Sequence, residues 1–203
     1  MKDIVIVSYY CDELGDYFQQ CNENLQHFIK FQDLNITTHC KHDNCNRDDL
    51  HKTLSNLNDN YLVTIYAHGE HNKIKDNSDA DLITIDDAMK YYNNAIVYST
   101  ACYAANGLGK EMHRYNCKFF YGYTKKAYIV SMYKDTFIEL DNFALKKILQ
   151  NKDIEPVELC KNINSFFDEK INDMRIHNPM VAPLIMHNRE SYKIYKNRQE
   201  YPA

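Results

Sequence analysis

Short apolar, β-branched runs recur along this chain, and segments with helical spacing separate them. The runs that predict buried strands cover residues 4–9, 35–40, 61–67, 95–100 and 118–123. The segments between them that predict helices cover residues 14–31, 48–57, 86–92 and 104–115. Strands that alternate with helices favour a parallel sheet with right-handed crossovers and helices on both faces. The pattern therefore predicts an α/β fold built on a mostly parallel sheet.

The remainder of the chain continues this pattern. Further elements are predicted at residues 82–85 (a short strand), 132–150 and 155–174 (helices) and 191–195 (an edge strand). The polar residues 69–81 predict an exposed loop, and Asp86 is expected to cap the helix 86–92. No repeat or long linker interrupts the sequence, so residues 1–203 are expected to form a single domain.

The charge balance and the cysteines argue against several classes of protein. With 24 Lys+Arg against 28 Asp+Glu, the chain lacks the basic surface of a nucleic-acid binder. Its 7 cysteines are odd in number and scattered, unlike a disulfide framework. No stretch approaches the roughly 20 apolar residues of a membrane span, and the first residues lack the features of a signal peptide. We therefore expect a cytoplasmic protein that binds neither nucleic acid nor membrane.

Two of the predicted strands end on residues that can do chemistry. His68 follows the run 61–67, and Cys102 follows the run 95–100. In an open α/β sheet, ligands bind in the crevice outside the carboxyl ends of the strands. If both runs are parallel strands, the imidazole and the thiol reach the same edge of the sheet. That is the arrangement a cysteine hydrolase requires.

The neighbours of these two residues fit the same chemistry. A free cysteine has a pKa of about 8.5, and a strand-to-helix junction beside a histidine is expected to lower it at Cys102. Gly69 has no side chain, so its backbone N–H and that of Cys102 could form an oxyanion hole. The small residues Ala101 and Ala104 are expected to leave room for a substrate backbone.

These residues resemble those of a known group of enzymes. The motif at 66–69 (Tyr-Ala-His-Gly), the one at 99–102 (Ser-Thr-Ala-Cys) and the strand at 119–123 resemble the caspase-like cysteine peptidases of clan CD, in particular the CHAT branch. The resemblance implies a caspase-like three-layer sandwich and a thiol protease with a Cys/His dyad and no metal. It assigns His68 as the base and Cys102 as the nucleophile, with Gly69 and Cys102 as the oxyanion donors.

The resemblance also carries implications for partners, and it has limits. Bacterial relatives often work in antiviral defence or regulated cell death beside a separate regulator, so a protein or peptide substrate and a separate activator are expected. The Gln before and the Arg-Gly after the caspase Ala-Cys are absent here. Thr100 stands where some relatives carry an acid that binds a basic P1 residue. Neither an aspartate-specific pocket nor that route to a basic-specific one is therefore supported.

Two acids near the first strand suggest a different basis for specificity. Asp12 and Glu13 follow the run 4–9 and are expected at the same sheet edge as the dyad. A carboxylate at the floor of the substrate-binding pocket would favour Lys or Arg at P1 through charge-assisted hydrogen bonds. Alternatively, Asp12 simply caps the helix that begins near Glu13.

Other classes of function remain open from the residues alone. The chain could be a non-catalytic caspase-like module that serves as a binding or scaffold subunit. The stretch 39–45 holds residue types that ligate zinc, but it lacks a second pair at recognised spacing. His68 and Glu70 fit half of the signature of a zinc-dependent deaminase, but no second cysteine follows Cys102 at the required spacing. We therefore expect neither a metal nor another cofactor.

Overall fold

The computed structural model describes residues 3–10, 12–41, 45–57, 60–196 and 199–203, apart from the side chains of residues 40 and 41. Its centre is a seven-stranded sheet with the order β10-β9-β8-β7-β3-β1-β2, in which β9 and β10 alone run antiparallel to their neighbours. The strands of this sheet are β1 (Asp3–Ser8), β2 (Thr37–Lys41), β3 (Leu62–Tyr66), β7 (Ile96–Ser99), β8 (Phe119–Tyr123), β9 (Tyr192–Lys196) and β10 (Gln199–Pro202). The α/β fold with a mostly parallel sheet is thus confirmed.

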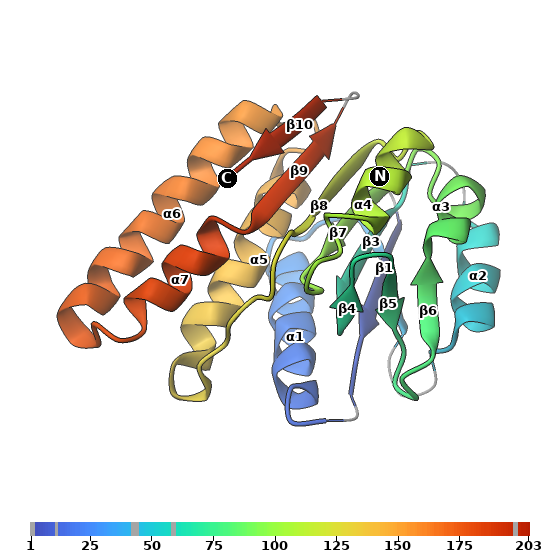
Figure 1. Ribbon diagram of the computed structural model, residues 1–203. Coiled ribbons are helices and arrows are strands. Elements are labelled where there is room, and N and C mark those ends of the chain that lie inside the picture. The colour runs from blue at the N-terminus through green and yellow to red at the C-terminus, as the bar shows by residue number, and fades with distance from the viewer. Residues whose placement is uncertain (1–2, 11, 42–44, 58–59, 197–198) are drawn as a thin grey trace.

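Helices cover both faces of the sheet. They are α1 (Gly15–Phe31), α2 (Arg47–Ser55), α3 (Ile85–Tyr91), α4 (Leu108–Arg114), α5 (Lys134–Gln150), α6 (Pro156–His177) and α7 (Ala182–Arg189), with a 3₁₀ turn, η1 (Ser131–Tyr133), before α5. Alternate strand residues face opposite cores: Ile4 and Ile6 pack with α1, α5, α6 and α7, whereas Val5 and Val7 pack with α2, α3 and α4. Figure 1 shows α2 and α3 on one side of the molecule and α6 and α7 on the other. Among the described residues, no helix is both long and apolar enough to cross a membrane.

The expected exposed loop at 69–81 is wrong. It contains β4 (Gly69–Glu70) and β5 (Lys73–Lys75), which form a small antiparallel sheet with β6 (Asp81–Thr84). Ile74 is fully buried between two lysines. One apolar residue among polar ones is too short a signal to predict a strand. These strands follow His68 directly, so they shape the edge of the sheet where chemistry is expected.

Three other features differ from the sequence prediction: one helix boundary, the place of one strand and one additional helix. The carboxylate of Asp87 accepts a hydrogen bond from the N–H of Thr84 at 2.8 Å, so Thr84 rather than Asp86 is the N-cap of α3. Strand β9 is not at the sheet edge, because β10 pairs outside it. Helix α7 was not predicted, because it is short and its apolar spacing is weak.

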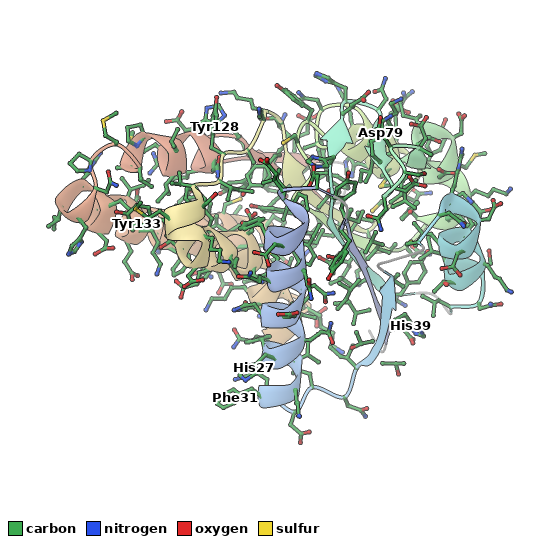
Figure 2. All side chains as sticks on the ribbon, turned by 90° about the horizontal axis from the view of Figure 1, so that it is seen from below. His27, Phe31, His39, Asp79, Tyr128 and Tyr133 are labelled. Atoms are coloured by element: carbon green, nitrogen blue, oxygen red, sulfur yellow. The ribbon has the colours of Figure 1, made fainter. Side chains whose placement is uncertain are left out.

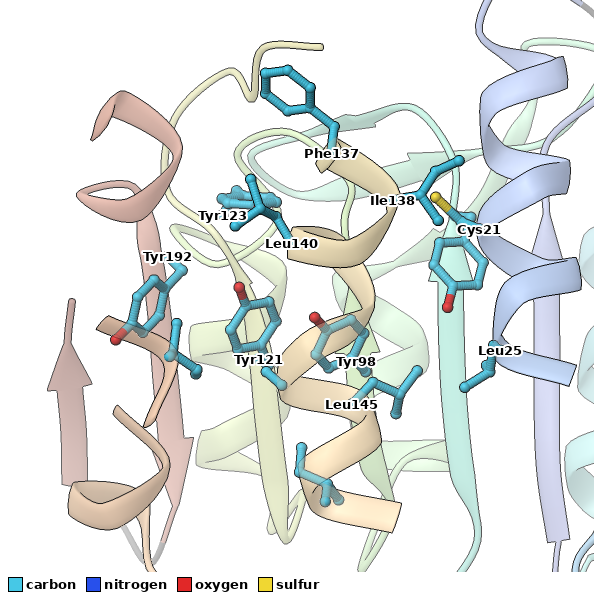
Figure 3. Close-up of a cluster of buried hydrophobic side chains, with 14 of the residues drawn as sticks. Cys21, Leu25, Tyr98, Tyr121, Tyr123, Phe137, Ile138, Leu140, Leu145 and Tyr192 are labelled. Carbon is cyan, nitrogen blue, oxygen red and sulfur yellow. The ribbon is translucent and has the colours of Figure 1, made fainter. Parts of the chain in front are cut away.

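The core beneath the carboxyl ends of the strands contains a buried acid. The buried carboxylate of Asp141, on α5, accepts hydrogen bonds from the hydroxyls of Tyr17 and Tyr123, each at 2.7 Å. Burial raises the pKa of Asp141 to about 6, although the two tyrosine hydroxyls lower it. Figure 3 shows Tyr98, Tyr121 and Tyr123 beside α5 in this layer. The network joins α1, β8 and α5 below the candidate site.

Candidate active site

His68 lies just beyond the end of β3, with its ring held by a carboxylate. Its Nε2 lies 2.6 Å from Oδ2 of Asp12. A carboxylate can only accept, so Nε2 carries the hydrogen and Nδ1 is the basic nitrogen of the neutral ring. The rings of Tyr9 and Phe18 meet the imidazole edge to face, with centroids 4.7 and 5.6 Å away. The side chain remains 35% exposed, so His68 is oriented but open to solvent.

Asp12 occupies the turn between β1 and α1 and makes contacts on both sides. Its Oδ1 accepts a hydrogen bond from the N–H of Leu14 at 2.9 Å, which closes the turn before α1. Its Oδ2 holds His68. Sequence reasoning anticipated a structural role at the start of the helix but missed the contact with His68. The pairing of adjacent parallel strands could have indicated this contact. Ser8 on β1 lies opposite Tyr66 on β3, so the residues that follow the two strands emerge side by side. Glu13 is exposed.

Cys102 lies in a series of turns after β7 and is half-buried. Its sulfur accepts a hydrogen bond from the backbone N–H of Ala127 at 3.4 Å. Burial raises the pKa of the thiol, the Ala127 N–H lowers it, and the negative charge of Asp141 raises it. The positive charge of Lys126 lowers it in turn. The net result is a raised pKa of the Cys102 thiol.

The expected lowering of the Cys102 pKa is therefore wrong, for a structural reason. The helix predicted from residue 104 begins only at Leu108, and turns fill the interval. Tyr103 adopts a left-handed backbone with φ of 61°. The thiol thus lacks the amide end of a helix beside it, and burial dominates.

The two sequence motifs are brought into direct contact at Gly69. A Cβ on Gly69 would lie 2.7 Å from the Cβ of Ala101 and 2.8 Å from the carbonyl oxygen of Cys102. Only glycine therefore allows the His-Gly backbone to approach the Ala-Cys backbone this closely. The side chains of His68 and Cys102 have separate hydrogen-bond partners among the described residues. His68 bonds to Asp12, and the sulfur of Cys102 bonds to Ala127.

The pairing of β4 with β5 fixes the direction of the Gly69 N–H. The N–H of Lys75 donates to the carbonyl of His68 at 3.1 Å, which makes these two a hydrogen-bonded pair of the β4–β5 ladder. Gly69, opposite Ile74, is then the non-hydrogen-bonded position, and its N–H points away from β5. The backbone N–H of Cys102 lies close enough to its own sulfur to lower the thiol pKa. The backbone of Gly69 is thus close to that of Cys102, with its N–H directed away from β5.

The alanines beside the thiol and the other described cysteines are mostly buried. Ala101 and Ala104 are fully buried in the core on the α2–α3–α4 face, so they pack inside the protein rather than make room for a substrate. Among the described cysteines, Cys21, Cys45 and Cys117 are buried, and burial raises the pKa of Cys117 to about 12. Only Cys102 and Cys160 are partly accessible in that set, whereas Cys11 lies outside the described residues.

Metal-ligand geometry and known relatives give no further assignment. Within the part of the chain that the structure describes, no three His, Cys, Asp or Glu side chains gather as a metal site. Of the zinc-like stretch 39–45, residues 42–44 lie outside the described ranges. The chain matches no protein-family model and no curated protein.

Proposed function

We propose that the protein is a cysteine endopeptidase of the caspase-like type, with Cys102 as nucleophile and His68 as base. The observation that carries this proposal is the contact at Gly69, where the His-Gly and Ala-Cys backbones meet. The Asp12 contact adds a third group, which fixes the tautomer of the imidazole. Nucleophile, base and orienting acid come from three separate segments that gather at one end of the sheet, which is how a site for acyl transfer is built.

The reaction follows from the roles of these groups. Nδ1 of His68 takes the proton of the Cys102 thiol, and the sulfur forms a bond to the scissile carbonyl carbon. The carbonyl electron pair moves to oxygen, where the N–H groups of Gly69 and Cys102 stabilise it. When this pair returns, the C–N bond breaks and the amine leaves with the proton from His68. Water then attacks the thioester, and hydrolysis restores the thiol.

An extended segment beside the thiol supports a peptide substrate. Residues 124–130, which we call the strap, run without helix or sheet pairing from the end of β8 to η1. The edge of the strap that faces Cys102 is incompletely paired, since no hydrogen bond among the described residues uses the Ala127 carbonyl or the Ile129 N–H. Free backbone groups in an extended chain can pair with a peptide as an added β-strand.

A peptide-library cleavage profile tests the proposal. Wild-type protein is compared with Cys102→Ala and with Cys160→Ala, which removes the other partly accessible thiol among the described cysteines. The Cys102 variant is expected to lose cleavage and the Cys160 variant to retain it. Cleavage that survives in Cys102→Ala would refute the assignment of the nucleophile. The profile also tests the proposed preference for Lys or Arg at P1 near Asp12 and Glu13.

A non-catalytic binding module is the second candidate. It is favoured by the raised pKa of Cys102 and by the separate bonding of the two side chains in this conformation. Peptides that bind equally well to the wild type and to Cys102→Ala, without cleavage by either, would support it. The resemblance to bacterial defence peptidases adds the proposal of a separate activating protein, whose addition belongs in the same assay.

A further inference from the structure

Helix α7 holds the strap through one buried side chain. The Oδ1 of Asn188 accepts from the N–H of Tyr128 at 2.8 Å, and its Nδ2 donates to the carbonyl of the same residue at 2.7 Å. Asn188 therefore pairs with Tyr128 as a neighbouring β-strand residue would. With only 2% of Asn188 exposed, water cannot readily replace these bonds. Figure 2 shows Tyr128 beside α7 and Tyr133 at the start of α5.

Two further residues, one in the last turn of α7 and one just after the helix, extend this attachment. Nε2 of His187 donates to the carbonyl of Lys126 at 2.9 Å. The carbonyl of Ser191 accepts from the N–H of Thr124 at 2.6 Å and from its hydroxyl at 2.8 Å. The even-numbered strap residues 124, 126 and 128 thus all bond toward α7. Their backbone groups form one edge of an extended chain.

The odd-numbered residues bond in the opposite direction, toward the thiol. The N–H of Tyr103 donates to the carbonyl of Lys125 at 3.3 Å, and the N–H of Ala127 donates to the sulfur of Cys102 at 3.4 Å. The strap is therefore hydrogen-bonded along one edge to α7 and the residues after it, and along the other edge to the turn that holds Cys102. The group that a substrate backbone would pair with, the Ala127 N–H, is already placed on the nucleophile.

We infer that the strap is an autoinhibitory cover over Cys102 and that α7, chiefly through Asn188, keeps it closed. This inference rests on the proposed function of the same site. In the closed state a peptide cannot reach the sulfur along the strap edge without displacing Ala127. An activator that pulls α7 away from the strap would let Ala127 leave the sulfur, which gives a peptide access both to the thiol and to the free edge of the strap. In this inference α7, which the sequence pattern did not predict, acts as a regulatory latch.

Opening of the strap changes the thiol in a definite direction. It increases access to the sulfur, and it removes part of the burial that is the largest cause of the raised thiol pKa. It also removes the Ala127 N–H, which lowers that pKa. Sulfur is a weak acceptor, and water can solvate the exposed thiolate in its place. The net expectation is faster reaction of Cys102 with an external electrophile.

The rate of alkylation of Cys102 by iodoacetamide near neutral pH tests the inference. The rate is measured for each cysteine by mass spectrometry in wild-type protein, Asn188→Ala, His187→Ala and Asn178→Ala. Asn178 is the matched control, because this nearby amide bonds to Tyr133 and Met180 rather than to the strap. Loss of two buried hydrogen bonds in Asn188→Ala should speed the reaction roughly tenfold. His187→Ala removes one bond and should give a smaller increase, and Asn178→Ala should give none.

The outcomes separate this inference from the proposed function. A folded Asn188→Ala with wild-type alkylation of Cys102 would overturn the latch, as would an equal increase in Asn178→Ala. If Asn188→Ala does not fold, His187→Ala decides the question. Peptide cleavage is measured in parallel: faster alkylation without cleavage of any peptide would keep the latch and refute the peptidase. Cleavage by the wild type that Asn188→Ala does not exceed would refute the autoinhibition.

Discussion

The two sides of the candidate site are built in different ways. On the histidine side, His68 is held by side chains: the Asp12 carboxylate at 2.6 Å and the rings of Tyr9 and Phe18. On the cysteine side, the sulfur of Cys102 is held by backbone, the Ala127 N–H at 3.4 Å. The base is oriented by side chains, whereas the half-buried nucleophile is held by the backbone of the strap.

This difference separates two requirements of catalysis. Orientation of the base needs only residues adjacent to it at the sheet edge, and it is complete in this conformation. Access to the nucleophile depends on the strap, and through it on α7 and Asn188. A site arranged in this way can be activated by a movement on the cysteine side alone. The two sides are expected to act as one unit in catalysis but to respond differently to substitution.

The largest expected effect is the loss of either central residue. His68→Ala and Cys102→Ala should each lower kcat/KM by more than about a thousandfold, and the double variant should be little worse, because nucleophile and base act together. The measurement is cleavage of the best peptide from the library. His71→Ala, whose ring stacks on Tyr103 rather than on the dyad, is the control. Additive losses in the double variant would argue against a single catalytic unit.

The buried acid on the cysteine side should make stability depend on pH. The folded pKa of Asp141 is about 6 against an ordinary value of 3.8, so the folded protein binds this proton more tightly than the unfolded chain. The free energy of unfolding should therefore fall, by roughly 2 kcal/mol, as the pH rises from about 4 to about 6. Urea unfolding of wild type and Asp141→Asn across that range isolates the effect. An identical pH dependence in both proteins would contradict it.

Gly69→Ala tests the contact between the two sides. The added Cβ would meet Ala101 and the Cys102 carbonyl at less than 3 Å, so the two backbones must separate. A displacement of about 1 Å at reacting groups can lower the rate about a hundredfold. We expect that loss in kcat, with a folded protein by circular dichroism. Glu70→Ala, on an exposed neighbour, is the control, and wild-type kcat in Gly69→Ala would show that the close approach is unnecessary.

Asp12→Asn tests the orientation of the base. An asparagine can donate to Nε2 and so favour the wrong tautomer of His68, which should lower kcat roughly tenfold to a hundredfold with little change in KM. The effect is smaller than that of losing His68, because the Asp12 side chain is 39% exposed and water can partly replace it. A change in KM without a change in kcat would instead support the role of Asp12 in binding a basic P1 residue.

The smallest expected effect belongs to Glu13. If this exposed carboxylate assists recognition of a basic P1 residue, Glu13→Ala should lower kcat/KM about twofold to fivefold for Lys and Arg substrates only, as surface charge pairs contribute little. The measurement compares matched peptides with Lys and Leu at P1. An equal effect on both peptides would remove Glu13 from the specificity of the site.

Much of the sheet and half of the site followed from the sequence. The apolar runs before His68 and Cys102 predict strands because burial on both faces demands continuous apolar residues, and both strands are present. Their parallel pairing brings the ends of β3 and β7 to the same edge, as expected. The β4–β5 hairpin and α7 were missed, because short elements are stabilised by tertiary contacts rather than by their own pattern.

What the sequence by itself determined is therefore local: which runs are buried, where they end, and that His-Gly and Ala-Cys stand at those ends. The tertiary structure alone decided how each residue is used. It joined Asp12 to His68 across 56 positions and Tyr128 to Asn188 across 60. It also left Cys102 half-buried, which reversed the expected direction of the thiol pKa. Periodicity reports which face of an element is buried, but contacts between distant segments and the solvation of a single side chain depend on how the whole chain packs.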